Sequence, residues 1–316
     1  MSAPNAPLPE PAQTDSRGEE LTYALTLVGA SLTQPKVDSL AASLASRGAR
    51  VAQGRWLSPA YAYDLPLALP EHFSLARVRE VASRALAQVD CALVPLADRR
   101  KSLLVADMDS TLVPTETIVE MAALAGVEAE VAALTAQAMR GRLDFVQALL
   151  DRVKLLRGLS AGAVAELGQT SLFSPGAETL CATMAAHGAR LVLVSGGFEL
   201  VTAAIAARLG IHRHVANQLV VMDGQLTGGL GLPLIDAEAK AQVLYEEVAT
   251  LEINVAQTLA VGDGANDLHM VQAAGLGVAY QGKPVLEAAA DATIVHSDLR
   301  SLLYFQGYSD AEIQQP

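Results

Sequence analysis

Two aspartates spaced two residues apart, Asp107 and Asp109, follow an apolar run in the stretch SLLVADMDSTLV. In an extended chain the side chains of residues i and i+2 point to the same side, so the two carboxylates are expected to lie together. Neighbouring anions are costly unless a cation, a shared proton or a chemical role accounts for them. The pair is a candidate for catalysis, and an acidic pair in a turn or helix cap is the alternative that the motif leaves open.

A serine and two glycines, Ser195, Gly196 and Gly197, follow a second apolar run, RLVLV. Glycines let backbone N–H groups approach an anion, and a hydroxyl adds a donor at the positive end of the helix expected from Phe198. Many strand-to-helix turns are rich in glycine, so this signal alone is weak. The stretch VSGGF lacks the G-x-S-x-G elbow, which disfavours a serine hydrolase.

A third apolar run, QTLAV, is followed by GDGANDL with Asp263, Asn266 and Asp267. Three oxygen-bearing side chains in five residues suit a hard cation such as Mg²⁺. A calcium loop of the EF-hand type is the competing interpretation. It fails because Leu268 stands where that loop needs glycine and Ala274 where it needs glutamate.

Two basic residues, Lys240 and Arg152, are candidates for binding an anion. Lys240 begins a helix after Asp236, where a lysine taken alone is usually solvated. Arg152 lies at helical spacing with apolar residues of LDFVQALLDRVKLL, so its guanidinium falls within an apolar face and needs an anionic partner. The apolar members of that stripe are Phe145, Leu149 and Leu156.

The elements that must position these residues form an α/β pattern. Apolar strands alternate with helices, which predicts a Rossmann-like, doubly wound parallel sheet with helices on both faces. Each chemical motif falls at the carboxyl end of a strand, where open α/β sheets place their ligands. We expect the core to span 101–113 and 171–316, with a purely helical cap inserted at 114–170. The expected strands are 102–107, 189–197, 257–264, 275–280 and 292–296.

The chain before the core predicts a separate α+β domain. Residues 21–97 read as strand, helix, strand, strand, helix, strand, which is a ferredoxin-like pattern. Residues 1–20 are rich in proline and lack a secretory signal, so we expect a disordered tail. The segment 227–233, TGGLGLP, is expected to be a hairpin loop.

Composition limits the classes of function. A chain of 316 residues with 51% hydrophobic content can bury a full core, and its formal charge of −12 argues against a nucleic-acid-binding surface. No segment is long and apolar enough to span a membrane, which excludes ion pumps that phosphorylate an aspartate. Cys91 and Cys181 have no metal-binding spacing and read as reduced thiols of a cytoplasmic protein. The six histidines form no metal-binding constellation.

Taken together, the motifs resemble those of the haloacid dehalogenase-like phosphatases and, within them, the phosphoserine phosphatase family. The resemblance covers residues 101–300 and rests on DMDSTL, RGRLDFVQALLDRVKLLRGL, VSGGF, the lysine of DAEAKAQVL and GDGANDL, in the family's order. The motifs DMDSTL and GDGANDL are shared by much of the superfamily. The cap stretch RGRLDFVQALLDRVKLLRGL narrows the resemblance to the phosphoserine phosphatase family. Residues 21–97 look like the amino-acid-binding, ACT-like domains of some members.

The resemblance implies a role for each position. Asp107 would be the nucleophile that forms an aspartyl-phosphate, and Asp109 the general acid and then the general base. Mg²⁺ would be held by Asp107, the backbone carbonyl of Asp109 and Asp263, with Asp267 in support. The groups that would grip the substrate phosphate are Ser195, Gly196, Gly197, Lys240 and Asn266.

In the cap, the resemblance implies that Glu116 binds the amino group of O-phospho-L-serine, that Arg152 binds its carboxylate and that Phe145 covers the site. The expected reaction is Mg²⁺-dependent hydrolysis to serine and phosphate, the last step of serine biosynthesis. Two alternatives stay open: phosphoryl transfer to another small metabolite, and an amino-acid sensor built on residues 21–97. The sequence leaves the oligomeric state open, a homodimer included, and predicts neither nucleic acid nor membrane as a partner.

Overall fold

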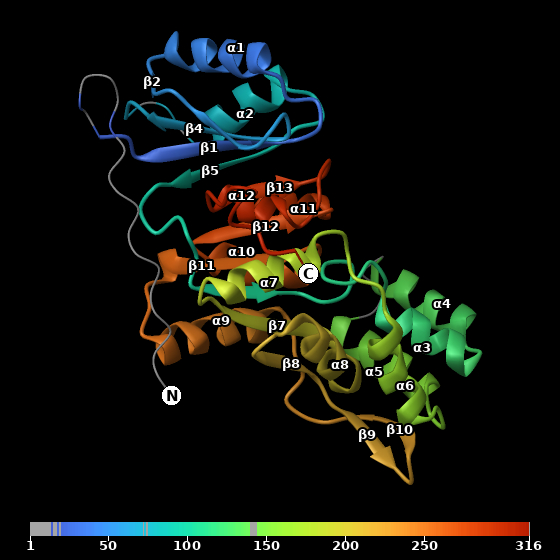
Figure 1. Ribbon diagram of the computed structural model, residues 1–316. Helices are drawn as coiled ribbons and strands as arrows, with labels where there is room; N and C mark the ends of the chain where they lie inside the picture. Colours follow the sequence, from blue (N-terminus) through green and yellow to red (C-terminus); the bar gives the residue numbers. More distant parts are fainter. Residues whose placement is uncertain are drawn as a thin grey trace.

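The computed structural model describes residues 14, 18, 20–71, 73, 75–139 and 144–315. Figure 1 shows an amino-terminal domain at the top, a central α/β core and a helical cap at the lower right. Most of the tail predicted over residues 1–20 lies outside the described residues.

The amino-terminal domain is an antiparallel sheet with two helices. Its strands lie in the order β2-β4-β1-β5, and β3 also pairs with β4. The second strand of the predicted strand, helix, strand, strand, helix, strand order is in fact two short strands, β2 and β3. Gly54 lies between them, where a Cβ would be only 2.4 Å from the carbonyl oxygen of Asp64, so the backbone passes too close to β4 for any other residue. The elements are β1 Tyr23–Val28, α1 Gln34–Ala45, β2 Arg50–Val51, β3 Arg55–Ser58, β4 Ala62–Ala68, α2 Leu75–Ala85 and β5 Asp90–Pro95.

The core is a parallel sheet in the order β13-β12-β11-β6-β7-β8, which confirms the predicted parallel α/β core. The edge strand β8 was not anticipated. The strands are β6 Leu103–Ala106, β7 Arg190–Phe198, β8 Arg213–Asn217, β11 Thr258–Gly262, β12 Leu276–Tyr280 and β13 Ala292–Ile294. The main helices are α7 Ala177–Ala186, α8 Glu199–Leu209, α9 Ala237–Leu251, α10 Leu268–Ala273, α11 Pro284–Glu287 and α12 Ser301–Phe305.

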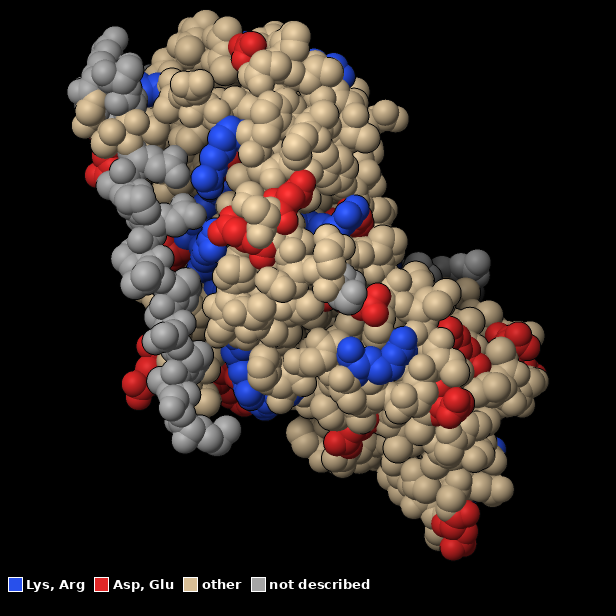
Figure 2. Space-filling view, viewed as in Figure 1, with Lys and Arg blue, Asp and Glu red and all other residues tan. Residues whose placement is uncertain are grey.

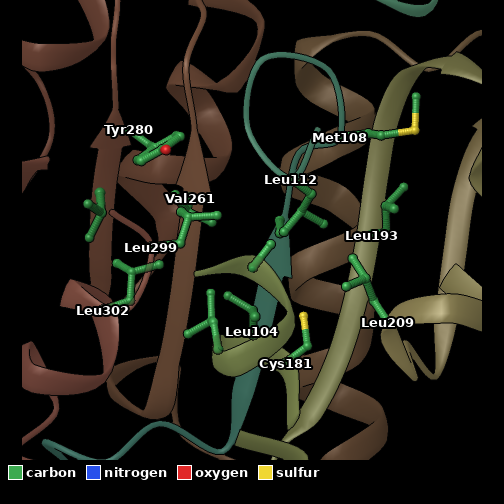
Figure 3. Packing of buried hydrophobic residues seen from close by; sticks show 14 of the residues in the cluster. Leu104, Met108, Leu112, Cys181, Leu193, Leu209, Val261, Tyr280, Leu299 and Leu302 are labelled. Atoms are coloured by element: carbon green, nitrogen blue, oxygen red, sulfur yellow. The ribbon is translucent and has the colours of Figure 1, made fainter. Parts of the chain in front are cut away.

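Both faces of this sheet are buried. Leu104 packs toward α7 and α12, whereas its neighbours Leu103 and Val105 pack with residues of α9 and α10 on the opposite face. Figure 3 shows the first of these layers, with Leu104 and Val261 from the sheet beside Cys181 from α7. Two covered faces explain why the strands read as continuous apolar runs and not as alternating ones.

The cap contains the predicted helices and also a hairpin from later in the chain. Its helices are α3 Thr117–Ala125, α4 Glu128–Met139, α5 Phe145–Leu155 and α6 Ala161–Thr170, and its hairpin is β9 Leu219–Met222 and β10 Gln225–Leu230. Leu226 exchanges backbone hydrogen bonds of 2.8 Å with Gly158 and Leu159, which attaches β10 to the helical insertion.

The prediction of a hairpin loop over 227–233 was wrong, because residues 227–230 belong to β10. The turn is Asp223–Gly224, with positive φ angles of 50° and 76°. Gly228, with φ of 81°, lies where the register of the hairpin shifts. An irregular, glycine-rich strand therefore has the composition of a loop.

Buried polar contacts join the amino-terminal domain to the core. The guanidinium of Arg99 donates to both carboxylate oxygens of Asp64 at 2.8 and 2.6 Å, and its Nε donates to the carbonyl of Phe305 in α12 at 3.0 Å. The carboxylate of Asp90 accepts hydrogen bonds from the backbone of residues 295–297, just after β13. Removing one partner of such a buried pair is strongly destabilising, so these contacts hold the two domains together.

The charged side chains on the face of the molecule in Figure 2 are mixed in sign. On the face in Figure 2, acidic and basic side chains are interspersed in small groups, without a broad basic area among the described residues. None of the helices in the described part of the chain has the length and apolar character needed to cross a membrane.

Candidate active site

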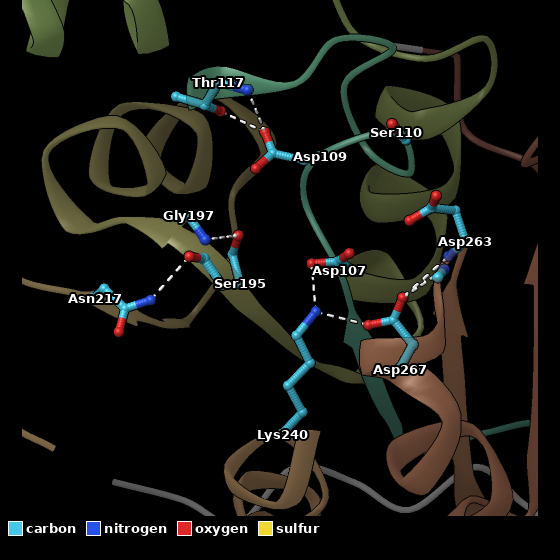
Figure 4. A network of polar contacts seen from close by, with 12 residues as sticks. Asp107, Asp109, Ser110, Thr117, Ser195, Gly197, Asn217, Lys240, Asp263 and Asp267 are labelled. Atoms are coloured by element: carbon cyan, nitrogen blue, oxygen red, sulfur yellow. Dashed lines mark hydrogen bonds and ion pairs between the residues drawn. The ribbon is translucent and has the colours of Figure 1, made fainter. Parts of the chain in front are cut away.

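Three neighbouring strands deliver the predicted chemical groups to one place. Asp107 directly follows β6, Asp263 directly follows β11, and Ser195 lies in the last part of β7. The backbone N–H of Asp107 donates to Val261 in β11 at 3.0 Å, which fixes the start of the Asp107 loop against the neighbouring strand. Figure 4 shows these side chains gathered above the carboxyl ends of the strands.

A buried lysine lies at the centre of the site. Lys240 is fully buried, and its Nζ lies 2.7 Å from Asp107 Oδ1 and 2.6 Å from Asp267 Oδ1. The side chain of Asp236 caps the start of α9 by accepting from the N–H of Ala239, which orients the helix that carries the lysine. The two carboxylates raise the pKa of Lys240 above its usual value although burial alone would lower it, so the ammonium stays charged.

Asp267 also organises the second acidic loop. Its Oδ2 accepts hydrogen bonds from the N–H groups of Asp263 and Gly264 at 3.1 and 3.0 Å. A Cβ at Gly262 would lie 2.4 Å from this carboxylate, so the site requires glycine there. Asp267 therefore links Lys240 to the loop that presents Asp263.

Three carboxylates form a candidate site for a divalent cation. Asp107, Asp263 and Asp267 each place an oxygen within 4.8 Å of the others. Burial and the charge of Asp267 raise the pKa of Asp107 well above its usual value, and burial raises the pKa of Asp263. Burial thus disfavours the charged forms of these carboxylates unless a cation is present, and their hard oxygen donors fit a cation such as Mg²⁺.

The carboxylate of Asp109 lies outside this cluster. The strand β6 ends at Ala106, so Asp107 and Asp109 lie in the loop that follows it, and the charge of Asp109 adds to the raised pKa of Asp107. The N–H of Thr117 donates to Asp109 Oδ1 at 3.0 Å, and the Thr117 hydroxyl donates to the same oxygen. Figure 4 shows the two carboxylates with different partners. Burial raises the pKa of Asp109 to about 7, and nearby Glu116 adds to the increase, whereas the Thr117 donors oppose it.

The Ser195–Gly197 turn is held by its own side chain and by a residue of β8. The Gly197 N–H donates to Ser195 Oγ at 2.8 Å, and the amide of Asn217 donates to the Gly196 carbonyl at 2.8 Å. A Cβ at Gly197 would lie 3.1 Å from Asp109 Oδ2, so a larger residue would crowd that carboxylate. The turn therefore lies directly beside Asp109.

Comparisons with known proteins agree with this geometry. The family model described as haloacid dehalogenase-like hydrolase matches residues 104–272. A phosphoserine phosphatase of Streptomyces coelicolor is 39% identical over 294 residues, covering 92% of this chain and 72% of that relative. This chain belongs to the haloacid dehalogenase-like hydrolase family.

Further relatives and solved structures carry the same name. A phosphoserine phosphatase of Methanocaldococcus jannaschii is 41% identical over 209 residues, covering 66% of this chain and 99% of the relative. The structure of a probable phosphoserine phosphatase from Vibrio cholerae superposes with a TM-score of 0.72 at 29% identity, covering 92% of this chain and 88% of that one. A substrate-bound phosphoserine phosphatase complex gives a TM-score of 0.60 at 40% identity over 65% of this chain and 98% of the other.

The predicted residues of the cap differ in their exposure and in their hydrogen-bond partners. Glu116 is exposed and accepts a hydrogen bond from Ser110 at 3.1 Å. The half-buried Arg152 donates to the Ala148 carbonyl at 3.1 Å and to Thr135 Oγ1 at 3.4 Å, both uncharged groups, and burial lowers its pKa. The side chain of Phe145 lies outside what the structure describes.

Asn266 is half-buried in the turn Ala265–Asp267 that follows the acidic loop. A Cβ at Gly264 would lie 2.3 Å from its Oδ1, so the amide packs against the backbone of the loop that presents Asp263. The structure therefore brings Asn266 to the site without giving its amide a charged partner among the described residues.

Three site residues were missed by the sequence analysis: Thr117, Asn217 and Lys283. Lys283 Nζ lies 3.2 Å from Asp263 Oδ2, and its own N–H donates to the Asp263 carbonyl at 2.8 Å. A lysine before a proline at a helix start signals only a helix boundary. Neither Thr117 nor Asn217 belongs to a motif, so only the fold reveals their contacts.

We expect the raised pKa of Asp109 to make the metal-free protein less stable as the pH rises. The folded pKa of about 7 exceeds the ordinary value of 3.8, so the folded state binds the proton more tightly than the unfolded state between these values. The contribution of Asp109 to the free energy of unfolding is therefore full below pH 3.8 and falls as the pH rises toward 7. Urea unfolding with chelator at several pH values should show a shallower decline for Asp109→Asn. Equal slopes for the two proteins would contradict the assignment.

Proposed function

We propose that this chain hydrolyses O-phospho-L-serine to L-serine and phosphate, the last step of serine biosynthesis, through an aspartyl-phosphate on Asp107. The observation that carries the proposal is that two carboxylates near each other in the sequence have different surroundings. Asp107 is buried and pairs with Lys240 in the acidic cluster. Asp109 instead accepts hydrogen bonds from Thr117, and burial raises its pKa to about 7. The names of the relatives and of the substrate-bound neighbour supply the substrate.

In the first step, a carboxylate oxygen of Asp107 forms a bond to phosphorus, and the bond between phosphorus and the serine oxygen breaks. Asp109, protonated at this stage, gives its proton to the departing serine oxygen. A pKa of about 7 suits this task, because the acid still holds its proton near neutral pH and releases it readily. The step leaves serine, an aspartyl-phosphate and an ionised Asp109.

In the second step, Asp109 accepts a proton from water while the water oxygen bonds to phosphorus. The bond between phosphorus and the Asp107 oxygen breaks, which releases phosphate and restores the carboxylate of Asp107. Asp109 is then protonated again and ready for another substrate. The two carboxylates thus need different surroundings, and the different partners of Asp107 and Asp109 support these roles.

We propose that Asp107, Asp263 and the backbone carbonyl of Asp109 hold Mg²⁺, with Asp267 supporting the loop of Asp263. A bound Mg²⁺ would keep Asp107 ionised and polarise the phosphoryl oxygens. The proximity of the Asp107, Asp263 and Asp267 oxygens supports this assignment.

The substrate phosphate would be held by fixed donors around Asp107. Lys240 supplies a charged donor, and the last part of β7 supplies a hydroxyl and backbone N–H groups. Such donors stabilise the transition state because they are already oriented before reaction. The proposed set is Ser195, Gly196, Gly197, Lys240 and Asn266.

Selectivity for phosphoserine would come from the cap. Glu116 would bind the substrate ammonium, Arg152 its carboxylate, and Phe145 would cover the site. Arg152 supports this proposal because it is half-buried with uncharged hydrogen-bond partners among the described residues. A guanidinium in that setting can form a strong bond to a ligand carboxylate.

We expect Arg152→Ala to lower kcat/KM for phosphoserine roughly 10- to 100-fold, the value of one hydrogen bond to a charged group. The rate on p-nitrophenyl phosphate, which has no carboxylate, should change less than about twofold. Phosphate release would be measured on both substrates with Mg²⁺ and with chelator, which should abolish turnover. Lys154→Ala is a matched control, since that exposed lysine of α5 pairs only with Asp151 among described residues. Equal losses on both substrates would refute the cap assignment.

We further propose that residues 21–97 form an ACT-like domain that binds an amino-acid effector. A cavity of about 380 Å³ lies between α1 and the sheet, and its wall includes Gln34, Asp38, Trp56 and Tyr63. The indole N–H of Trp56 donates to Gln34 at 3.0 Å, and Gln34 donates to Asp38 at 2.8 Å. Calorimetry of the full chain with L-serine should give a binding heat that Trp56→Ala weakens, and no heat with the wild type would reject the proposal.

We also propose a cytoplasmic location, on the ground of the two cysteines. Both are free thiols in the structure. Burial raises the pKa of Cys91 to about 11 and that of Cys181 to about 12, which keeps them protonated and unreactive. Reduced, inert cysteines are typical of cytoplasmic proteins.

A further inference from the structure

Asp109 is joined to the cap by direct hydrogen bonds. Thr117 is the first residue of α3, the first cap helix, and only 2% of its surface is exposed. Both of its donors, the backbone N–H and the hydroxyl, point at the same oxygen of Asp109, Oδ1. Asp109 is thus held by the cap, although it belongs to the loop that follows core strand β6.

Because Thr117 bonds only to Oδ1, the other carboxylate oxygen of Asp109, Oδ2, is available for proton transfer. Asp109 Oδ2 makes no hydrogen bond with a described residue and lies beside the Ser195–Gly197 turn, 3.1 Å from the position of a Cβ at Gly197. An oxygen that already accepts two hydrogen bonds is a poor site for a proton. The proton that Asp109 exchanges therefore belongs on Oδ2.

We propose that Thr117 is a positioning residue that fixes the orientation of Asp109 and assigns proton transfer to its Oδ2; this inference rests on the proposed function. When the bond between phosphorus and the serine oxygen breaks, the proton moves from Oδ2 to that oxygen. When water attacks the aspartyl-phosphate, Oδ2 accepts the water proton, and the Asp107 oxygen leaves phosphorus.

The same short segment couples this orientation to substrate binding. Glu116, the proposed ligand of the substrate ammonium, directly precedes Thr117 and accepts a hydrogen bond from Ser110, the residue after Asp109. Ser110 has a positive φ of 56°, which turns the chain sharply at this point. The proposed ligand of the substrate and the residue that holds Asp109 are therefore adjacent at the start of α3. A movement of α3 would change substrate binding and the orientation of Asp109 together.

A purely structural role is the alternative. The residue before α3, Glu116, makes no side-chain hydrogen bond to the helix start, and Asp109 instead accepts from the first free N–H of the helix. Asp109 thus acts as the helix cap, and Thr117 would then contribute only to the stability of the cap. The two roles differ in which chemical step responds to loss of the hydroxyl.

The test compares Thr117→Val, which removes the hydroxyl at nearly constant shape, with Thr117→Ser, which keeps it. Thr117→Ala is a second variant should valine disturb folding, and unfolding temperatures would be measured for all. Thr170→Val is a matched control, because the hydroxyl of this exposed cap residue bonds to backbone carbonyls of its own helix. Each enzyme would be assayed with phosphoserine, whose leaving oxygen needs a proton, and p-nitrophenyl phosphate, whose leaving group needs none.

We expect Thr117→Val to lower kcat on phosphoserine about tenfold, with KM within about twofold. This is less than the roughly 100-fold or larger effect of losing a general acid, because the N–H of residue 117 still holds Asp109. With p-nitrophenyl phosphate, the first burst of nitrophenolate should keep its wild-type rate, and the later steady rate should fall because water attack needs the base. Thr117→Ser should restore both rates, and Thr170→Val should match the wild type.

Three results would overturn the inference: an unchanged kcat for Thr117→Val, an equal slowing of the burst, or failure of Thr117→Ser to restore the rate. The wild type provides a separate check on the proposed function. If it releases no phosphate from phosphoserine but cleaves p-nitrophenyl phosphate, the proposed substrate is wrong. The ratio of burst to steady rate on the aryl ester then still decides the role of Thr117.

Discussion

The ammonium of Lys240, buried between Asp107 and Asp267, is the interaction on which the rest of the site depends. A charged group that is buried away from water needs oppositely charged partners at fixed positions. The Nζ of Lys240 lies 2.7 Å from an oxygen of Asp107 and 2.6 Å from an oxygen of Asp267. Asp267 in turn accepts from two N–H groups of the loop that presents Asp263. One buried cation therefore joins β6, α9 and the loop after β11, which lie far apart in the sequence.

The sequence predicted the parts of this site that are tied to strand ends. Apolar runs identify the strands, and carboxyl ends of neighbouring parallel strands lie at one edge of a sheet, so Asp107, Ser195 and Asp263 could be brought together without coordinates. Lys240 was different. Taken alone it read as a solvated lysine, and only the resemblance to a family suggested that it is buried in the site.

Other features depend on tertiary contacts and could not be predicted. The carboxylates of Asp107 and Asp109 have different partners, Lys240 and Thr117, which their spacing alone did not predict. Thr117 occupies an ordinary helix start in the sequence, and its importance comes from the carboxylate that packs against it. The strand around Gly228 read as a loop because its register shift allows glycine, and only pairing with β9 shows that it is a strand.

In the proposed reaction, the carboxylate of Asp107 takes the phosphoryl group from the substrate. The most direct measurement is acid quench of the enzyme during turnover of ³²P-labelled phosphoserine, followed by digestion and identification of the labelled peptide. We expect acid-stable label on the peptide that contains Asp107, and neither label nor phosphate release for Asp107→Asn. Label on another residue, or near-normal turnover by Asp107→Asn, would contradict it.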